Sequence, residues 1–455
     1  MIGAACFLCL VAAPDAGALP VDGQAGSFRP PQPPPAVELT SDASVPPSDA
    51  RSGLDANAPV PRPNESRFRV VYDVRLVPNE RLAKVEIQLE NRRRIAKVEL
   101  TATPGQHLDF SGDGTVEARD SGQVIWTPPP DRGVLRFSAR IEHTRGDQSY
   151  DARVATEWAL FRGDDLIPRI KVRRKVGSKG RAELRFTLPK RWKVEAPYKR
   201  KKGMAHTFVL PGGARALTRP TGWIIAGLIQ SSQERIGSTD VIVATPKTRG
   251  LHGREILTFL RWTLPKVSEL VGALPPRLLI VGAGDPMWRG GLSAPASLFL
   301  HRDRPLVDDD GSSPLLHELV HVVTQAQSSD DGDWFVEGLA EMYSIELLHR
   351  AGGLSESARK EAYGAQERRA TGASSLLVGH STGATTARAV LVLAGLDKEI
   401  RRATNGARSL DDLVRELVAH PRPLSTEDFR RLAESIAGRS FESWFQEQLR
   451  HEGKK

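Results

Sequence analysis

Two histidines with a glutamate between them are the first feature of this sequence that could carry out chemistry. His317 and His321 are four residues apart, and Glu318 directly follows the first of them. On a helix this spacing places both imidazoles on one face, one turn apart, where they can bind the same metal ion. Glu318 would then lie beside them, near enough to take a proton from a water that the metal holds. The spacing therefore predicts a zinc site with Glu318 as its catalytic base.

The residues around this motif predict the helix that it requires. Ser312 and Ser313 suit a helix cap, Pro314 suits the first helical position, and a helix is expected over residues 314–327. The alternative is a helix that carries two surface histidines without a metal. With 11 histidines in the chain, chance occurrences of the five-residue pattern number on the order of 0.02, which favours the metal site.

A second helix is expected over residues 337–350, and the run that opens it, Trp334 to Glu341, starts 13 residues after His321. This run resembles the gluzincin metallopeptidases, in which a Trp-x-x-Glu-Gly element supplies a glutamate ligand and an acid one turn later hydrogen-bonds a metal-binding histidine. The resemblance implies that Glu337 is the third ligand and that Glu341 is the hydrogen-bond partner. The exchange of these two roles stays open as an alternative.

Among the gluzincins, the chain is most similar to the glycyl aminopeptidase family, whose members combine a β domain, a thermolysin-like catalytic domain and often a PDZ domain. Gly290, Gly291 and Leu292 resemble the strand on which that family binds its substrate, and the runs between residues 396 and 413 resemble its C-terminal helices. The resemblance covers about residues 67–451. No PDZ domain is expected, because the chain ends too soon for one.

Two departures from this family bear on the reaction. Ser293 stands where the family has a glutamate that binds the free amino group of the substrate, which argues against aminopeptidase activity. A carboxylate that reaches the site from another direction is the alternative. The candidates for that carboxylate are Glu341, Asp308, Asp309 and Asp310.

The second departure concerns the group that stabilises the developing oxyanion. Thr386 stands where the family's transition-state tyrosine aligns, so this donor stays unassigned. The candidate donors in this chain are His380, Tyr363, Tyr343 and Arg388.

The pattern of elements around these motifs predicts a multidomain fold. Short alternating runs separated by turn signals occupy residues 67–245 without long helices, which is typical of an all-β sandwich. Helical periodicity then dominates residues 246–455, interrupted by a strand at 277–281, so a mainly helical α+β catalytic domain is expected there. The resemblance implies that this domain is thermolysin-like. Further helices are expected over residues 255–270, 387–404, 410–419, 426–437 and 441–451.

The first 66 residues differ in composition from the rest. Residues 1–18 begin with an apolar run and end in small residues, which is typical of a signal peptide, so we expect an exported protein that is periplasmic, envelope-associated or secreted. No Lys or Arg precedes the apolar run, and a frayed terminal segment is the alternative. Residues 19–66 hold 11 of the 32 prolines, which predicts a disordered linker. The only cysteines, Cys6 and Cys9, lie in the opening, so no disulfide or Cys-based zinc site is expected.

Positive charge is concentrated in one segment of a chain whose net charge is +9. Residues 169–202 contain 15 Lys or Arg residues against Glu183 and Glu195. This basic segment is a candidate for contact with an anionic surface, although the solvated face of a sheet is the favoured interpretation. We expect no specific nucleic-acid binding. No transmembrane helix is expected in the mature chain, because no later segment approaches 18 uninterrupted apolar residues.

These features together predict zinc-dependent hydrolysis of peptide bonds in a peptide or protein substrate. The substrate is expected to lie along the strand at residues 290–292 and to be cut internally or at a blocked end, not by stepwise removal of N-terminal residues. The alternative is an envelope protein that holds zinc but is catalytically inactive and grips a partner. The two departures support that alternative, whereas Glu318 argues against it, since a binding protein has no evident use for a base.

Overall fold

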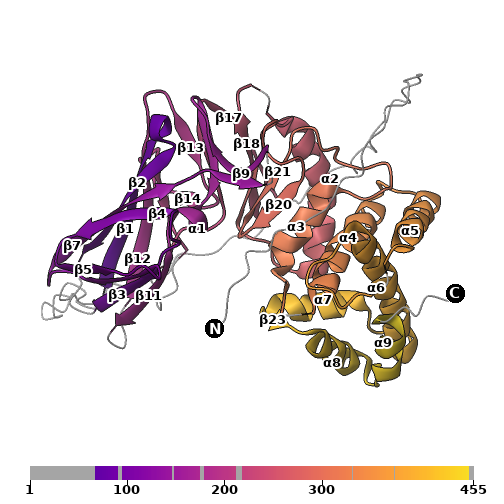
Figure 1. Ribbon diagram of the computed structural model, residues 1–455. Helices are drawn as coiled ribbons and strands as arrows, with labels where there is room; N and C mark the ends of the chain where they lie inside the picture. The colour runs from indigo at the N-terminus through magenta and orange to yellow at the C-terminus, as the bar shows by residue number, and fades with distance from the viewer. Residues whose placement is uncertain are drawn as a thin grey trace, which may run out of the picture. The chain divides into compact units, whose positions relative to one another are not determined.

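The computed structural model describes residues 67–90, 95–145, 148–174, 179–211, 218–248, 250–329, 331–373 and 375–449. All of these residues belong to one compact unit of the chain. The expected signal peptide at 1–18 and the expected linker at 19–66 lie outside the described residues. A β-rich region comes first in the described chain and a mainly helical region follows it (Figure 1), which confirms the order predicted from the sequence.

Within the described residues, the largest sheet has seven strands in the order β14-β15-β12-β1-β2-β7-β4. Buried and more exposed residues alternate along its strands, as in β2, so that one face of each strand enters the core. The strands are β1 (Arg67–Val77), β2 (Leu82–Glu90), β4 (His107–Gly112), β7 (Arg132–Arg140), β12 (Lys179–Thr187), β14 (Lys199–Arg200) and β15 (Thr207–Val209).

A four-stranded sheet in the order β11-β3-β6-β5 shares its hydrophobic core with the largest sheet. Trp126 of this smaller sheet and Tyr72 of the larger one are both fully buried in that core. Since β11 stands at the end of the strand order, it is an edge strand. The four strands are β3 (Ile95–Thr101), β5 (Thr115–Ala118), β6 (Gln123–Thr127) and β11 (Arg169–Arg174).

A five-stranded sheet in the order β13-β16-β10-β9-β8 connects the β-rich region to the rest of the unit. All residues of β16 are buried, because the two faces of this strand enter different cores. Ile224 and Ala226 join the core of the β-rich region, whereas Trp223 and Ile225 join a second core that includes Leu279 and other residues of the next sheet. The strands are β8 (His143–Arg145), β9 (Ser149–Val154), β10 (Trp158–Arg162), β13 (Lys193–Glu195) and β16 (Trp223–Gly227).

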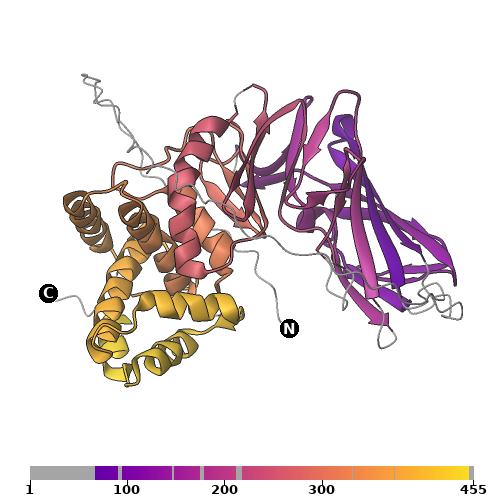
Figure 2. The same cartoon turned by 180° about the vertical axis from the view of Figure 1, so that it is seen from behind.

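The sheet that carries the site has the order β17-β18-β19-β21-β20, with β20 at its edge. Helix α2 (Gly253–Val271) packs on one face, against residues such as Val243 and Ile280 (Figure 2). The opposite face packs on β16, and burial on both faces explains why β19 and the middle of β18 are continuously apolar, whereas β17 is mostly polar. The strands are β17 (Ile229–Ile236), β18 (Thr239–Pro246), β19 (Arg277–Val281), β20 (Gly291–Ala294) and β21 (Ser297–Leu300).

The sheet that contains β17 and β18 does not respect the domain boundary expected from the sequence. β18 pairs in parallel with β19, so the expected boundary between residues 245 and 246 separates two neighbouring strands of one sheet. The sequence placed both strands in the first domain because short strand runs continue to residue 245 without a long helix. A division near residue 228 keeps this sheet whole.

Two hydrogen bonds from Trp223 tie β16 to the sheet that carries the site. The main-chain N–H of Trp223 donates to Oγ of Ser297 at 2.8 Å. Its indole N–H donates to the carbonyl of Leu292, in the edge strand β20, at 2.9 Å. The β-rich region is therefore bonded directly to the strand beside the candidate site.

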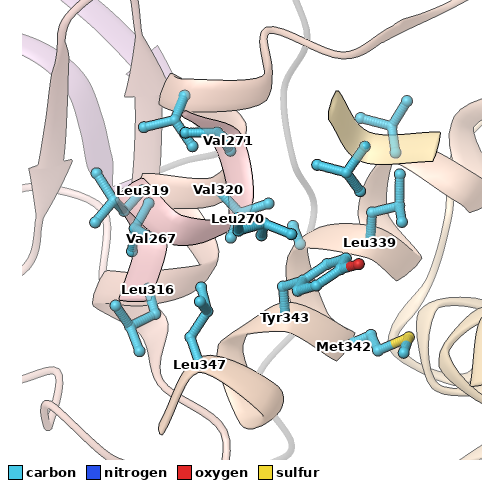
Figure 3. Close-up of a cluster of buried hydrophobic side chains, with 14 of the residues drawn as sticks. Val267, Leu270, Val271, Leu316, Leu319, Val320, Leu339, Met342, Tyr343 and Leu347 are labelled. Atoms are coloured by element: carbon cyan, nitrogen blue, oxygen red, sulfur yellow. The ribbon is translucent and has the colours of Figure 1, made fainter. Parts of the chain in front are cut away.

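The helical region is built around a continuous apolar core. Figure 3 shows side chains of α2, α3 and α4 meeting in this core, among them Leu270, Leu319 and Tyr343. The helices are α3 (Pro314–Thr324), α4 (Asp333–Arg350), α5 (Glu356–Ala370), α6 (Gly383–Ala403), α7 (Leu410–Ala419), α8 (Thr426–Ala437) and α9 (Glu442–Leu449). Among the described residues, no helix combines the length and apolar character needed to cross a membrane.

Much of the basic segment at residues 169–202 forms strands whose charges are partly paired. Lys201 donates to both oxygens of Glu183 at 2.8 and 2.9 Å, and Arg200 forms an ion pair with Glu195 at 2.9 Å. These contacts agree with the favoured interpretation of the basic segment as the solvated face of a sheet. Contact of this segment with an anionic surface stays a prediction.

Candidate metal centre

Helix α3 holds the two histidines, and its start is fixed just before them. The side chain of Ser313 caps the helix by accepting from the N–H of Leu316 at 3.3 Å, and its hydroxyl donates to the carbonyl of Leu306 at 2.6 Å. Pro314 occupies the first turn. The helix ends at Thr324, because the next residue, Gln325, has a φ of 48°. It is thus three residues shorter than the helix expected over 314–327, since a left-handed residue cannot continue it.

The side chains of His317, His321 and Glu337 come together as a group in which His317 and Glu337 are buried and His321 is partly buried. The two Nε2 atoms lie 3.2 Å apart. Each also lies 3.5 Å from a carboxylate oxygen of Glu337, which α4 supplies. One ligand atom from each of the three residues can be chosen so that all lie within 4.8 Å of one another. Two imidazole nitrogens this close would repel through their lone pairs unless a proton or a metal ion lay between them.

The geometry of this group fits a zinc ion. Tetrahedral coordination with Zn–N and Zn–O bonds of about 2.0–2.2 Å separates ligand atoms by about 3.3–3.5 Å. The observed separations of 3.2, 3.5 and 3.5 Å lie close to that range. Two imidazoles and one carboxylate are also the donor set of zinc sites that keep a fourth position open. Glu337, not Glu341, is the carboxylate beside both Nε2 atoms.

Glu341 lies one turn further along α4 and orients the first histidine. Its Oε2 is 3.0 Å from Nδ1 of His317, so that this nitrogen carries the proton and Nε2 is directed at the metal position. Its Oε1 accepts from Gln366 at 3.2 Å and from Arg369 at 3.4 Å. Arg369 in turn binds Asp310 at 2.7 Å. This arrangement matches the hydrogen-bonding role that the resemblance implied for Glu341.

The sequence offered no signal for Gln366 or Arg369, and it indicated Asp310 only as a possible acid for the substrate's amino group. Gln366 and Arg369 lie on α5, a helix that the sequence analysis did not expect. This helix buries only Ala362 and Gln366, so its sequence lacks the apolar face that marks a packed helix.

The charges of the group determine the protonation of its members. Burial alone would lower the pKa of His317, but hydrogen bonds to Glu337 and Glu341 raise the pKa well above its ordinary value. Burial alone would raise the pKa of Glu337, but the two imidazoles hold it well below its ordinary value. A metal ion that binds here therefore displaces a proton shared by this group.

Glu318 is buried beside the ligands but is not one of them. Its Oε2 has no hydrogen-bond partner within the described part of the chain. Burial raises the pKa of Glu318, while the charges of the two histidines and a main-chain hydrogen bond with Ser293 act in the opposite direction. A carboxylate with a raised pKa and a free oxygen is suited to accept a proton.

The residues expected to bind substrate lie at the free edge of the sheet. Gly291, Leu292 and Ser293 belong to β20, and Gly290 precedes it. The carbonyl of Gly290 accepts from the N–H of His301 at 2.9 Å, which extends the pairing between β20 and its neighbouring strand β21 by one residue pair. Because main-chain groups alternate in an antiparallel pair, Gly291 and Ser293 direct theirs toward the free edge. An extended peptide can add to such an edge as a further strand.

A cavity of about 680 Å³ joins the metal centre to the β-rich region. His321 and Glu337 line it together with Ser293 and its neighbours in β20. Another part of the wall comes from the β-rich region, which no sequence pattern linked to the site. The charged residues of that part are Arg162, Asp164, Asp165, Arg169 and Arg219.

Three of the candidate oxyanion donors are engaged elsewhere. The hydroxyl of Tyr363 donates to Glu346 and that of Tyr343 to Asp411, each at 2.8 Å. Arg388 donates to main-chain carbonyls. None of these three lines the cavity. Their side chains stabilise contacts between helices and the loops beside them.

His380, the fourth candidate, is exposed on the loop before α6 and does not line the cavity. This loop is attached near the metal centre, because the N–H of Ser381 donates to Asp333, at the start of α4, at 2.6 Å. Thr386, at the position of the missing tyrosine, is buried within α6.

Comparison with known proteins finds no matching family model and no matching curated protein. Solved structures do match. An aminopeptidase N family protein from Idiomarina loihiensis has a TM-score of 0.65 at 14% identity, over 85% of this chain and 76% of that one. A variant of an M1 zinc metallopeptidase from Deinococcus radiodurans, bound to a Tyr-Ser-Ala substrate, has a TM-score of 0.57 at 14% identity, over 86% and 94% of the two chains.

Yeast LTA4 hydrolase also matches, with a TM-score of 0.52 at 12% identity over 86% of this chain and 69% of that one. At these identities the matches establish the fold and not the reaction. They agree with the predicted resemblance to gluzincins, while they do not test the narrower likeness to the glycyl aminopeptidase family. The described chain has the fold of the M1 zinc metallopeptidases, a β-rich region followed by a helical region that carries a His-His-Glu metal centre.

Proposed function

We propose that this protein is a zinc metallopeptidase that hydrolyses peptide bonds in peptide or protein substrates. The observation that carries the proposal is the group formed by His317, His321 and Glu337, whose spacing fits zinc, beside the free carboxylate oxygen of Glu318. The M1 fold supports it, as does the peptide bound to one of the structural neighbours. Bound zinc would polarise the scissile carbonyl and lower the pKa of water.

The residues of the chain divide the remaining work. Glu318 accepts the proton of the attacking water and passes it to the leaving amine, a transfer for which its Oε2 has no competing partner among the described residues. Glu341 keeps His317 in the tautomer that binds metal. The main chain of Gly291 and the carbonyl of Ser293 hold the substrate in extended form along β20, since the N–H of Ser293 donates to Glu318. A binding protein without catalysis would leave the buried carboxylate of Glu318 without a role.

We further propose that the substrate is cut internally or carries a blocked amino terminus. Ser293 has no charge with which to bind a terminal ammonium group. Three of the acids considered as replacements are used elsewhere: Asp308 pairs with Arg304 at 3.0 Å, Asp310 with Arg369 at 2.7 Å, and Glu341 is held by His317. Asp308, Asp309, Asp310 and Glu341 do not line the cavity. The cavity also continues past Ser293, which leaves room for a longer chain.

Three narrower features stay part of this proposal. They are the thermolysin-like character of the helical region, the likeness to the glycyl aminopeptidase family and the export of the chain. Export rests on the composition of residues 1–18.

The test is a digest of a diverse peptide library by the zinc-loaded protein, with products identified by mass spectrometry. We expect cleavage by the wild type. We expect Glu318→Gln to keep its zinc and to lose at least about 10²- to 10⁴-fold in turnover, because the amide cannot accept the proton. Glu416→Gln is the matched control, since Glu416 is exposed on α7. Equal cleavage by Glu318→Gln and the wild type would exclude Glu318 as the base.

A further inference from the structure

Three arginines stand in the part of the cavity wall that the β-rich region contributes. Arg162 ends β10, Arg169 begins β11, and Arg219 precedes β16. Asp164 and Asp165, in the short helix α1 (Gly163–Leu166), line the same wall. The sign of the charge that this wall presents to a substrate depends on which of these groups neutralise one another.

Asp164 and Arg162 neutralise each other. Nη2 of Arg162 donates to Oδ2 of Asp164 at 2.6 Å, and Nε of the same arginine lies 3.3 Å from Oδ1. The N–H of Gly222 also donates to Oδ1, at 3.2 Å. The carboxylate of Asp164 is thus bonded on both oxygens and is poorly placed to bind a substrate.

Arg219 is held in the wall by groups that carry no charge. Its Nη1 donates to the carbonyl of Ile167 at 2.9 Å and to that of Asp164 at 3.3 Å. Among the described residues, no hydrogen bond engages its Nε or Nη2. Burial lowers the pKa of Arg219, while the charges of Asp164 and Asp165 act in the opposite direction. Part of its hydration has thus been lost without a hydrogen-bonded carboxylate in exchange. An anion in the cavity would restore that stabilisation.

Arg169 adds a second cation at the same wall. Its side chain is exposed at the start of the edge strand β11, and its partner in the neighbouring strand is Thr101, which has no charge. Within the described part of the chain, no carboxylate forms an ion pair with Arg169. Its guanidinium is therefore free to contact a molecule in the cavity.

Asp165 is the group that opposes these cations. Its main-chain carbonyl accepts from Gln106 at 2.9 Å and faces Nε2 of His107 at 3.0 Å, which fixes its position. Burial raises the pKa of its carboxyl and the charge of Asp164 acts in the same direction, while the charges of Arg162, His143 and Arg219 act against it. After Arg162 and Asp164 cancel, two guanidinium groups remain in this wall against one carboxylate. The balance is positive.

We propose that Arg169 and Arg219 form a subsite that binds the carboxylate of an aspartate or glutamate side chain in the peptide substrate. The inference rests on the proposed function, because the same cavity links both arginines to Ser293, His321 and Glu337. Arginine suits this task, since its planar guanidinium donates two parallel hydrogen bonds to a carboxylate. The subsite would select acidic peptides without any anchor for a terminal amino group.

The test measures binding, so that it does not depend on turnover. Zinc-loaded Glu318→Gln protein is titrated with fluorescent peptides acetylated at the amino end and amidated at the carboxyl end. The peptides form pairs that differ only by Glu or Gln, placed at each position in turn. We expect the Glu peptide to bind about 10-fold more tightly at one position, in line with one charge-assisted contact.

Two second-site variants identify the source of that preference. Arg169→Gln should reduce the Glu preference to less than about 3-fold and leave the Gln peptides unchanged. Arg254→Gln is the matched control, because Arg254 is exposed on α2 and does not line the cavity. Arg169 is the better test position, since Arg219 also holds the main chain of α1 in place.

The outcomes show whether the arginines or Asp165 determine which peptides this cavity wall prefers. No preference at any position, or a preference of similar size in Arg169→Gln, overturns the subsite. Tighter binding of matched Lys peptides also overturns it and identifies Asp165 as the dominant charge. If an Arg169-dependent preference appears but the wild type cuts none of the peptides, the subsite stands and the proposed hydrolysis fails. If the wild type cuts the peptides but shows no Glu preference in binding, the proposed hydrolysis stands and the subsite fails.

Discussion

A β-carbon built on Gly291 would lie 2.5 Å from Cγ of Glu318 and 2.7 Å from its Oε1. Atoms that are not bonded do not approach so closely, so the edge strand can pass the carboxylate only where the side chain is absent. The strand and the base are thereby held in contact. This contact fixes the position of the carboxylate relative to the edge on which a substrate would lie.

We expect Gly291→Ala to retain zinc and to lose at least about 10-fold in kcat, because the methyl group must displace Glu318 or β20. Zinc content and steady-state kinetics on one cleavable peptide measure the two effects. Gly364→Ala on α5 is the control, since a β-carbon there would lie 3.5 Å from the flexible end of Arg368, an ordinary contact. Full activity in Gly291→Ala would show that the carboxylate can move without consequence.

We expect the purified wild type to hold one zinc ion per chain and His317→Ala to hold much less. Loss of one of three ligands leaves too few donors for a stable site. Since zinc binds the folded chain, a free zinc concentration 1,000 times the Kd should stabilise the wild type by about 4 kcal/mol. Elemental analysis and thermal unfolding with and without a chelator check both statements. Equal zinc content in the two proteins would exclude the proposed ligand set.

The contact between Arg369 and Glu341 leads to a prediction on metal affinity. Arg369→Ala should weaken zinc binding by about 10- to 100-fold, because Glu341 then orients His317 less firmly. Competition with a chromophoric chelator at constant pH gives the affinity. Arg368→Ala serves as the control, since Arg368 is exposed in the same turn of α5. An unchanged affinity in Arg369→Ala would mean that Gln366 alone holds Glu341.

The lack of an acid at Ser293 predicts how the substrate's end is treated. A peptide with an acetylated amino terminus should be cut at least as efficiently as the same peptide with a free one. A charge-assisted hydrogen bond to the ammonium group, worth about 1.5–3 kcal/mol, is not available here. Mass spectrometry of timed digests identifies the products. Stepwise trimming of the free peptide together with resistance of the acetylated one would contradict this interpretation of Ser293.

Local patterns in the sequence were sufficient to place the helices of the metal centre. The four-residue spacing of His317 and His321 and the serine cap before Pro314 depend only on neighbours along the chain, so they can be recognised without a structure. The start of α4 lies at Asp333, four residues before the expected start at Glu337, because the helix also buries Trp334 and Phe335. Apolar periodicity shows that a helix is present more reliably than it shows at which residue the helix begins.

Contacts between distant segments could not be predicted in this way. Arg369 reaches Glu341 across 28 residues, and no local pattern marks the pair. Arg219, in the cavity wall, is separated from the two histidines by a still longer stretch of sequence. Likewise, the apolar run in β18 predicts a strand but not the sheet that it joins, since its partners are chosen by packing on α2 and β16.

The two bonds from Trp223 to Ser297 and Leu292 have a consequence for the modularity of this protein. Ile242, Leu279 and Phe299 are buried in the core that they share with Trp223. A chain trimmed before β17 would present that apolar face to water and would lose the bond that steadies β20. The helical region is therefore not an independent folding module, and both regions should unfold in one cooperative transition. Recombination that exchanged the β-rich region would have to preserve this indole and the surface around it.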